Sequence, residues 1–224
     1  MSETLVLAVD TSTHASLVAL GAGEPVAVSR RAVQHRHGSH VLEQIDEVLG
    51  AAGRSLDDVA ALAVGTGPGS FTGLRVGLAT VKTIAYARTL PLVGVMSSDA
   101  LRLAATHAGA AAGSAVVLPA GARDHYLARP GTDPVLIAPG ELAETLAGTA
   151  VLAIDMDADL LGEEAVRLGA SAVEGMPAAL LELARARLAE GETDDVAELT
   201  PAYVALPRGV RRAAEDLGWS PDLR

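Results

Sequence analysis

Apolar and polar positions change their spacing several times along the first hundred residues. Short apolar runs bounded by Gly, Asp, Ser or Thr predict strands, whereas apolar residues three or four apart predict helices. Val41, Ile45 and Leu49 mark one face of an amphipathic helix that stops near Gly50. The pattern predicts strands at 5–9, 16–20 and 25–28, a helix over 41–49, a strand at 59–64, a helix over 73–88, a strand at 92–95 and a helix over 98–107.

The second half of the chain repeats this order in a weaker form. It predicts strands at 115–118, 125–128 and 135–138, a helix over 141–146, a strand at 151–155 and helices near 158–168 and 177–190. Two lobes, each with a three-stranded meander plus crossover helices, are typical of the duplicated, ribonuclease-H-like α/β fold of the actin, hexokinase and Hsp70 group (ASKHA). We expect an N-terminal lobe over 1–102, a degenerate C-terminal lobe over 103–206 and a peripheral tail over 207–224.

Composition narrows the class of protein. The net charge is −11 and only five residues are aromatic, so direct binding of nucleic acid by this chain is disfavoured. No apolar run reaches the roughly 18 residues that a membrane span needs, and the acidic start, which has no basic region, does not resemble an export signal. Because the chain has no cysteine, we expect a reducing, cytoplasmic location and no membrane association.

The turn Asp10-Thr11-Ser12-Thr13 follows the first strand. In the expected fold this turn is where phosphates or their metal meet the protein, and its oxygens could hold a metal-bound phosphate. The alternative is an Asx turn that only ends the strand. Asp10, Thr11 and Ser12 are therefore candidates for a vestigial phosphate turn, and no cofactor is predicted.

The glycine-rich stretch 65–77 lies between a strand and a helix, where a phosphate loop would sit. It lacks the Gly-Lys-Ser/Thr of a Walker loop, and Thr72 stands where a dinucleotide fingerprint requires glycine. The helix that follows is apolar nearly all round, which indicates that it is covered on more than one side. Gly73 and Gly77, one turn apart, let another backbone approach closely, either that of a partner or that of the chain itself.

The titratable residues do not group into a catalytic centre. His35, His37 and His40 cluster near the start of the helix over 41–49, but a zinc site needs a further ligand, so a solvated or interface cluster is favoured. The acidic run from Asp155 to Glu164 is interpreted as a solvated helix start, with acids near the positive end of the helix dipole. We predict no catalytic residue and no metal site.

Three motifs of the chain have counterparts in a known family. The chain resembles the TsaB (YeaZ) family of bacterial tRNA threonylcarbamoyladenosine biosynthesis proteins in Leu7-Ala-Val-Asp-Thr-Ser-Thr13, in Gly67-Pro-Gly-Ser-Phe-Thr-Gly-Leu-Arg-Val-Gly77 and in Pro201-Ala-Tyr203. The resemblance is close over residues 4–101 and loose beyond them. Gly121-Ala122-Arg123, followed by His125-Tyr126, resembles a family Asp-Ala-Arg and Val-Tyr pattern in which glycine has replaced the acid.

The resemblance implies a role and a set of partners. Members of the family pair with TsaD, the paralogous subunit that transfers a threonylcarbamoyl group to the adenosine beside the anticodon of tRNAs reading codons that begin with A, and they act with the ATPase TsaE. The chain is then a non-catalytic scaffold in a heterodimer, a homodimer when TsaD is absent, and in contact with tRNA only through the complex. Aligned with TsaD, Ser97 and Leu101 stand where two metal-binding histidines would be, and neither is a useful metal ligand.

In this family the first two helices form the pairing surface. On this sequence the implied surface comprises Val41, Ile45, Leu49, Gly73, Val76, Gly77, Thr80 and Ile84. Which side of the second helix faces outward is not decided by the sequence. Gly77→Arg is expected to abolish pairing while the monomer remains folded.

Two alternative functions remain open. An ATP-dependent small-molecule kinase of the same fold class would use Asp10 and the glycine-rich stretch to bind ATP, and titration with Mg-ATP separates it from a scaffold. A metallopeptidase or chaperone-like protein would need metal ligands that the sequence does not group together.

Overall fold

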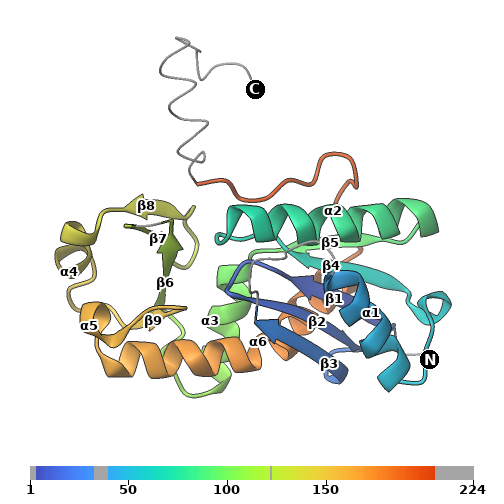
Figure 1. The fold of residues 1–224 in the computed structure, drawn as a ribbon, viewed down its shortest axis with the longest axis horizontal. Helices are drawn as coiled ribbons and strands as arrows, with labels where there is room; N and C mark the ends of the chain where they lie inside the picture. The colour runs from blue at the N-terminus through green and yellow to red at the C-terminus, as the bar shows by residue number, and fades with distance from the viewer. Residues whose placement is uncertain (1–3, 33–39, 122, 205–224) are drawn as a thin grey trace, which may run out of the picture.

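The computed structural model describes residues 4–32, 40–121 and 123–204, which form two lobes with one β-sheet each (Figure 1). The first sheet has the strand order β3-β2-β1-β4-β5. Its strands are β1 (Val6–Asp10), β2 (Ala15–Gly21), β3 (Pro25–Ala32), β4 (Ala61–Gly65) and β5 (Leu92–Val95). Strands β1, β2 and β3 pair antiparallel, and β1 pairs parallel with β4, so the predicted meander and crossover are confirmed.

Helices cover both faces of this sheet. Helices α1 (His40–Ala51) and α2 (Phe71–Arg88) pack on one face, and α3 (Ser97–His107) and α6 (Glu163–Ala189) on the other. In β1, Leu7 and Val9 lie in the core with α1 and α2, whereas Val6 and Ala8 lie in the core with α3 and α6. Burial on both faces explains why the first strand is a continuous apolar run. The 3₁₀ helix η1 (Leu56–Asp58) precedes β4.

The second lobe repeats the first in reduced form. Its strands are β6 (Ala115–Ala120), β7 (Asp124–Ala128), β8 (Val135–Ile137) and β9 (Val151–Ala153), in the order β8-β7-β6-β9. Strands β6, β7 and β8 form an antiparallel meander, and β9 pairs parallel with β6, as β4 does with β1. The helical elements η2 (Pro139–Glu141), α4 (Leu142–Thr145) and α5 (Ala158–Leu161) are short. The predicted duplicated α/β fold is confirmed.

The prediction of two helices near 158–168 and 177–190 is wrong. The structure has the short α5 and then one continuous helix, α6, which contains Pro177. Proline has no N–H for the carbonyl four residues earlier, here that of Val173. Arg30 of β3 supplies the missing donor, because its Nη2 donates to the carbonyl oxygens of Val173 (2.8 Å) and Glu174 (3.0 Å). The Val173 carbonyl that Pro177 leaves without a helical partner is therefore satisfied from β3.

The two lobes share one core. Helix α6 packs with strands of both sheets, and Figure 1 shows it running from the second lobe to the first. The expected boundary between 102 and 103 falls inside α3, and the expected tail over 207–224 lies outside the described residues. None of the helices in the described part is long and apolar enough to cross a membrane.

Candidate functional site

Asp10 ends β1 with its carboxylate turned into the protein, where only 1% of the residue is exposed. Oδ1 accepts hydrogen bonds from the Ser12 backbone N–H (2.8 Å) and hydroxyl (2.7 Å), and Oδ2 accepts one from the Ser97 hydroxyl (2.6 Å). Burial raises the pKa of Asp10, against the effect of the hydrogen bonds from Ser97 and Ser12. Both oxygens therefore have partners from the chain itself, and the turn ties β1 to the start of α3.

Glycines let this turn lie against the glycine-rich stretch and α2. A Cβ atom at Gly65 would lie 1.7 Å from Asp10 Oδ2, one at Gly73 would lie 2.1 Å from the Thr11 carbonyl oxygen, and one at Gly77 would lie 2.3 Å from Thr11 Oγ1. The chain's own turn therefore lies against both glycines, through the Thr11 carbonyl at Gly73 and the Thr11 side chain at Gly77, and Gly77 is buried beneath it rather than on an open pairing surface. Gly77→Arg collides with Thr11, so it is now expected to destabilise the fold.

The apolar stripe of α1 is also placed differently from the implied pairing surface. Val41, Ile45 and Leu49 are 1%, 4% and 6% exposed and pack against the sheet. An amphipathic helix on a sheet buries its apolar side, so these residues hold α1 in place and leave little surface for a partner. The outward side of the helix carries Leu42, which is 54% exposed, and Asp46.

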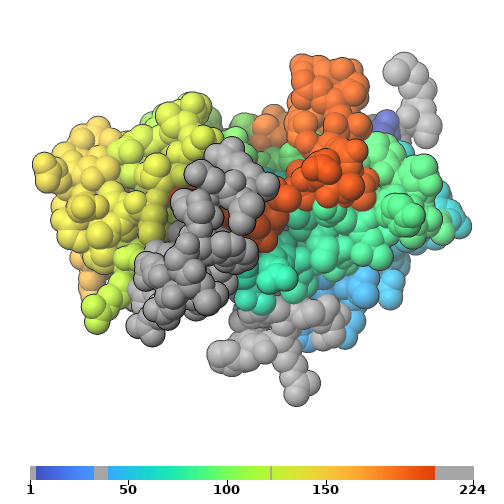
Figure 2. Space-filling view, turned by 90° about the horizontal axis from the view of Figure 1, so that it is seen from above, coloured from blue at the N-terminus to red at the C-terminus, as the bar shows by residue number. Residues whose placement is uncertain are grey.

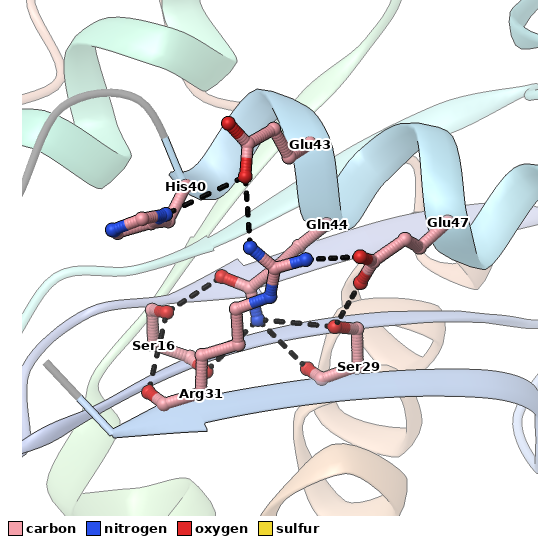
Figure 3. A network of polar contacts seen from close by, with 7 residues as sticks. All are labelled: Ser16, Ser29, Arg31, His40, Glu43, Gln44 and Glu47. Carbon is pink, nitrogen blue, oxygen red and sulfur yellow. Dashed lines mark hydrogen bonds and ion pairs between the residues drawn. The ribbon is translucent and has the colours of Figure 1, made fainter.

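Gln44 lies within this buried stripe and fixes α1 on the meander (Figure 3). Its Oε1 accepts a hydrogen bond from the Ser16 hydroxyl (2.6 Å). Its Nε2 donates to the carbonyl oxygens of Ser16 (3.2 Å) and Ser29 (3.2 Å) and reaches the Ser29 hydroxyl (3.3 Å). A fully buried amide with these partners sets the position of α1 along β2 and β3.

An ion-pair network lies above the amide, as Figure 3 shows. Arg31 of β3 pairs with Glu43, at 2.8 Å, and with Glu47 of α1. Hydrogen bonds from the Arg31 guanidinium and then from His40 lower the pKa of the Glu43 carboxyl. The Nδ1 atom of His40 lies 3.5 Å from Glu43 Oε2, so His40 belongs to this network, whereas His35 and His37 lie outside the described residues.

Helix α2 presents three kinds of surface. Its buried side is formed by Leu74, Gly77, Leu78, Val81 and Ala85. The side directed to solvent carries the small residues Thr72, Ala79 and Thr83. Between the two sides lies a half-buried row at i, i+4 and i+8, formed by Val76, Thr80 and Ile84. A partner could reach these three residues of the implied pairing surface, and Gly73, which is also half-buried.

The hydroxyls of Thr80 and Thr83 are satisfied by the helix itself. Thr80 Oγ1 donates to the Val76 carbonyl oxygen (2.8 Å), and Thr83 Oγ1 donates to that of Ala79 (2.7 Å). Ala79 and Thr83 therefore present methyl groups on the exposed side, between Arg75 and Tyr86, which is 83% exposed. We call the outward sides of the two helices the α1–α2 face: Leu42, Thr72, Val76, Ala79, Thr80, Thr83, Ile84 and Tyr86.

The two positions aligned with the histidines of TsaD are both inside the protein. Ser97 is fully buried, its hydroxyl donates to Asp10, and its oxygen accepts a hydrogen bond from the Gly67 N–H (3.0 Å). Leu101 is fully buried in the core between the lobes. Within 4–32, 40–121 and 123–204, no three His, Asp or Glu side chains are grouped so that they could hold a metal ion.

Some residues that shape the site were not predicted. Gln44 could have been found as the polar residue in the buried stripe of α1, three residues after Val41. Lys82 binds a distant segment, and its only signal is that it is the single lysine of the chain. Asp155 is not simply solvated, because its Oδ2 accepts a hydrogen bond from the His14 N–H (2.7 Å), 141 residues earlier. No local pattern reports such a contact.

The sequence model of one family, "TsaD: tRNA N6-adenosine threonylcarbamoyltransferase", matches residues 28–195, well over half of the chain. A Haemophilus influenzae protein named "tRNA threonylcarbamoyladenosine biosynthesis protein TsaB" is 42% identical over 106 residues, 47% of this chain and 44% of that protein. The Escherichia coli K12 protein of the same name is 39% identical over 90 residues, 40% of this chain and 39% of that protein. The matched region thus spans less than half of each relative.

Solved structures match over a longer stretch. A crystal structure described as an uncharacterized protein with similarity to peptidase YEAZ from Pseudomonas aeruginosa has a TM-score of 0.66 and 25% identity, covering 90% of this chain and 100% of that one. YeaZ from the same organism has a TM-score of 0.66 and 24% identity, covering 89% of this chain and 99% of that one. The chain therefore belongs to the TsaD family and is of the TsaB (YeaZ) type.

Proposed function

We propose that this chain is a non-catalytic subunit in tRNA threonylcarbamoyladenosine biosynthesis, which pairs with TsaD and acts with TsaE. The names of the Haemophilus influenzae and Escherichia coli relatives supply the pathway. The α1–α2 face is the observation that supports pairing, since it offers methyl groups and the exposed side chains of Leu42 and Tyr86 on two helices that are firmly fixed to the sheet. The chain alone forms a homodimer through the same face.

The state of the Asp10 turn supports a scaffold rather than a transferase. The carboxylate of Asp10 is buried and its oxygens are bonded to Ser12 and Ser97. Leu101, one of the two positions aligned with the metal-binding histidines of TsaD, is fully buried in the core between the lobes. The net charge of −11 agrees with a subunit that meets tRNA only through its partners.

The test is co-elution with TsaD from the same organism. Thr83→Arg places a long charged side chain in the middle of the α1–α2 face without entering the core, so it should abolish a standard interface of about 1,600 Å². Thr145→Arg is the matched control, because Thr145 is also exposed but lies on α4 of the second lobe. Pairing that survives Thr83→Arg as well as it survives Thr145→Arg would count against this face.

A reconstituted assay tests the role itself. Threonylcarbamoyl transfer to tRNA by TsaD, TsaE and the threonylcarbamoyl-adenylate synthase should need this chain, and the chain without TsaD should make no product. Titration of the isolated chain with Mg-ATP addresses the kinase alternative, since a kinase should bind the nucleotide without any partner.

A further inference from the structure

A segment without helix or strand follows α6 and lies along the first lobe. Residues 192–203, which we call the strap, leave α6 after Gly191, whose φ of +76° turns the chain back. Figure 1 shows the strap running beside α2, and Figure 2 shows its orange to red atoms against the green atoms of that helix. The strap thus connects the long helix of the second lobe to the helix that supplies most of the α1–α2 face.

The first part of the strap closes the free edge of β5. The Asp194 N–H donates to the Leu92 carbonyl oxygen (2.8 Å), and Asp194 Oδ2 accepts a hydrogen bond from the Gly94 N–H (2.7 Å). Arg187 of α6 completes the arrangement, because its Nη1 donates to the Gly94 carbonyl oxygen (2.7 Å) and to Asp194 Oδ2 (3.0 Å). The backbone N–H and carboxylate of Asp194, together with the Arg187 guanidinium, take the place of the neighbouring strand that an edge strand lacks.

The second part of the strap is fastened to α2 by Lys82. Its Nζ donates to the carbonyl oxygens of Ala197 (3.0 Å) and Leu199 (2.9 Å). The side chain of Leu199 packs against Gly94 of β5, so closely that a Cβ atom on Gly94 would lie only 2.8 Å from Leu199 Cδ1. Because Lys82 is the only lysine of the chain, its amine is the single side-chain ammonium available for this purpose.

The end of the strap reaches the first turn of α2. The Ala202 N–H donates to the Thr66 carbonyl oxygen (2.8 Å). The ring of Tyr203 lies 5.3 Å from that of Phe71, and the guanidinium of Arg75 lies 5.4 Å from the centre of the Phe71 ring on its own helix. This stack borders the α1–α2 face, because Phe71 directly precedes Thr72 and Arg75 lies one helical turn before Ala79.

The fastening is of a kind that can open without unfolding the lobe. Few backbone hydrogen bonds join the strap to the sheet or to α2, and most of its attachments run from a side chain to a carbonyl or N–H group. Such segments open at a lower free energy than core strands do. Tyr203, with 45% of its surface exposed, leaves one side of the aromatic stack accessible to a partner on α2.

We propose that the strap is a clamp coupled to the α1–α2 face, so that binding of a protein partner there tightens the strap and release of the strap weakens binding. This rests on the proposed function, because the partner is TsaD. A partner seated across α2 shields the stack of Arg75, Phe71 and Tyr203 from water, which favours the fastened strap. By thermodynamic reciprocity the fastened strap must favour the partner by the same factor.

The experiment uses the full chain, TsaD from the same organism, and hydrogen exchange. Lys82→Met keeps the apolar stem and removes only the ammonium. It should speed exchange of the Asp194 and Ala202 amides at least tenfold, leave the amides of β1 unchanged, and weaken the affinity for TsaD at least tenfold. Arg88→Met is the matched control: Arg88 lies on the same helix and pairs with Asp57, away from the strap, so affinity and exchange should not change.

A second measurement needs no variant. Addition of TsaD to the wild-type chain should slow exchange of the Asp194 and Ala202 amides at least tenfold, although their hydrogen-bond acceptors, Leu92 and Thr66, belong to the same chain. Unchanged exchange, or Lys82→Met binding TsaD as tightly as the wild type, overturns the coupling while leaving pairing intact. Absence of any binding by the wild-type chain overturns the proposed function, and the coupling with it.

Discussion

Replacement of Gln44 by leucine tests how α1 is held in the orientation that exposes its outward side. Gln44 is fully buried and uses its amide to join Ser16 of β2 and Ser29 of β3. Leucine fills nearly the same volume, so no large cavity forms, but the Ser16 hydroxyl loses its short hydrogen bond. Buried groups left without partners cost about 1–3 kcal/mol each, and each lost hydrogen bond contributes about 1 kcal/mol. We expect Gln44→Leu to lower the free energy of unfolding by about 2–4 kcal/mol.

Urea denaturation followed by circular dichroism measures this change. The midpoint should fall with no change in the m-value, and the melting temperature should fall by about 5–15 °C for a chain of this length. Asp46→Asn is the control, because Asp46 is exposed on the outward side of the same helix and should leave the midpoint unchanged. A loss for Gln44→Leu below about 1 kcal/mol, the size of an ordinary surface substitution, would refute the anchoring role.

Two further predictions concern Asp10 and the continuity of α6. Burial raises the pKa of Asp10, so the stabilisation by protonated Asp10 is fully present below the unfolded value of 3.8 and is lost as the pH rises above it. The free energy of unfolding of Asp10→Asn, relative to that of the wild type, should therefore increase with pH in urea titrations from pH 3.5 to 7. Equal pH profiles for the two proteins would contradict this. Arg30→Ala should cost about 1–2 kcal/mol of unfolding free energy, because the Val173 carbonyl loses its donor. In a Pro177→Ala background Arg30→Ala should cost clearly less, since the alanine N–H can donate to the Val173 carbonyl. An equal cost in both backgrounds would show that Arg30 does not act by replacing this N–H.

The sequence by itself determined the order and type of the elements in the first lobe. Apolar runs predict strands such as β1 and β5, and the spacing of Val41, Ile45 and Leu49 predicts α1. These predictions succeed because the period of apolar positions and the turn residues are local properties of the sequence. The same local patterns predict the duplicated order, and the motifs around Asp10 and Gly67 indicate the family.

Only the tertiary structure decided which surfaces are free. Periodicity identifies an apolar stripe but not what covers it. The family resemblance places Val41 and Gly77 on a pairing surface, whereas in the structure the sheet and the turn at Thr11 cover them. The donor for the Val173 carbonyl, which Pro177 cannot supply, comes from Arg30, more than 140 residues away. The hydrogen bond from Lys82 to Ala197 of the strap joins residues 115 positions apart. Such contacts are absent from any local window, because they form only when the chain folds and brings remote donors and acceptors within about 3 Å of one another.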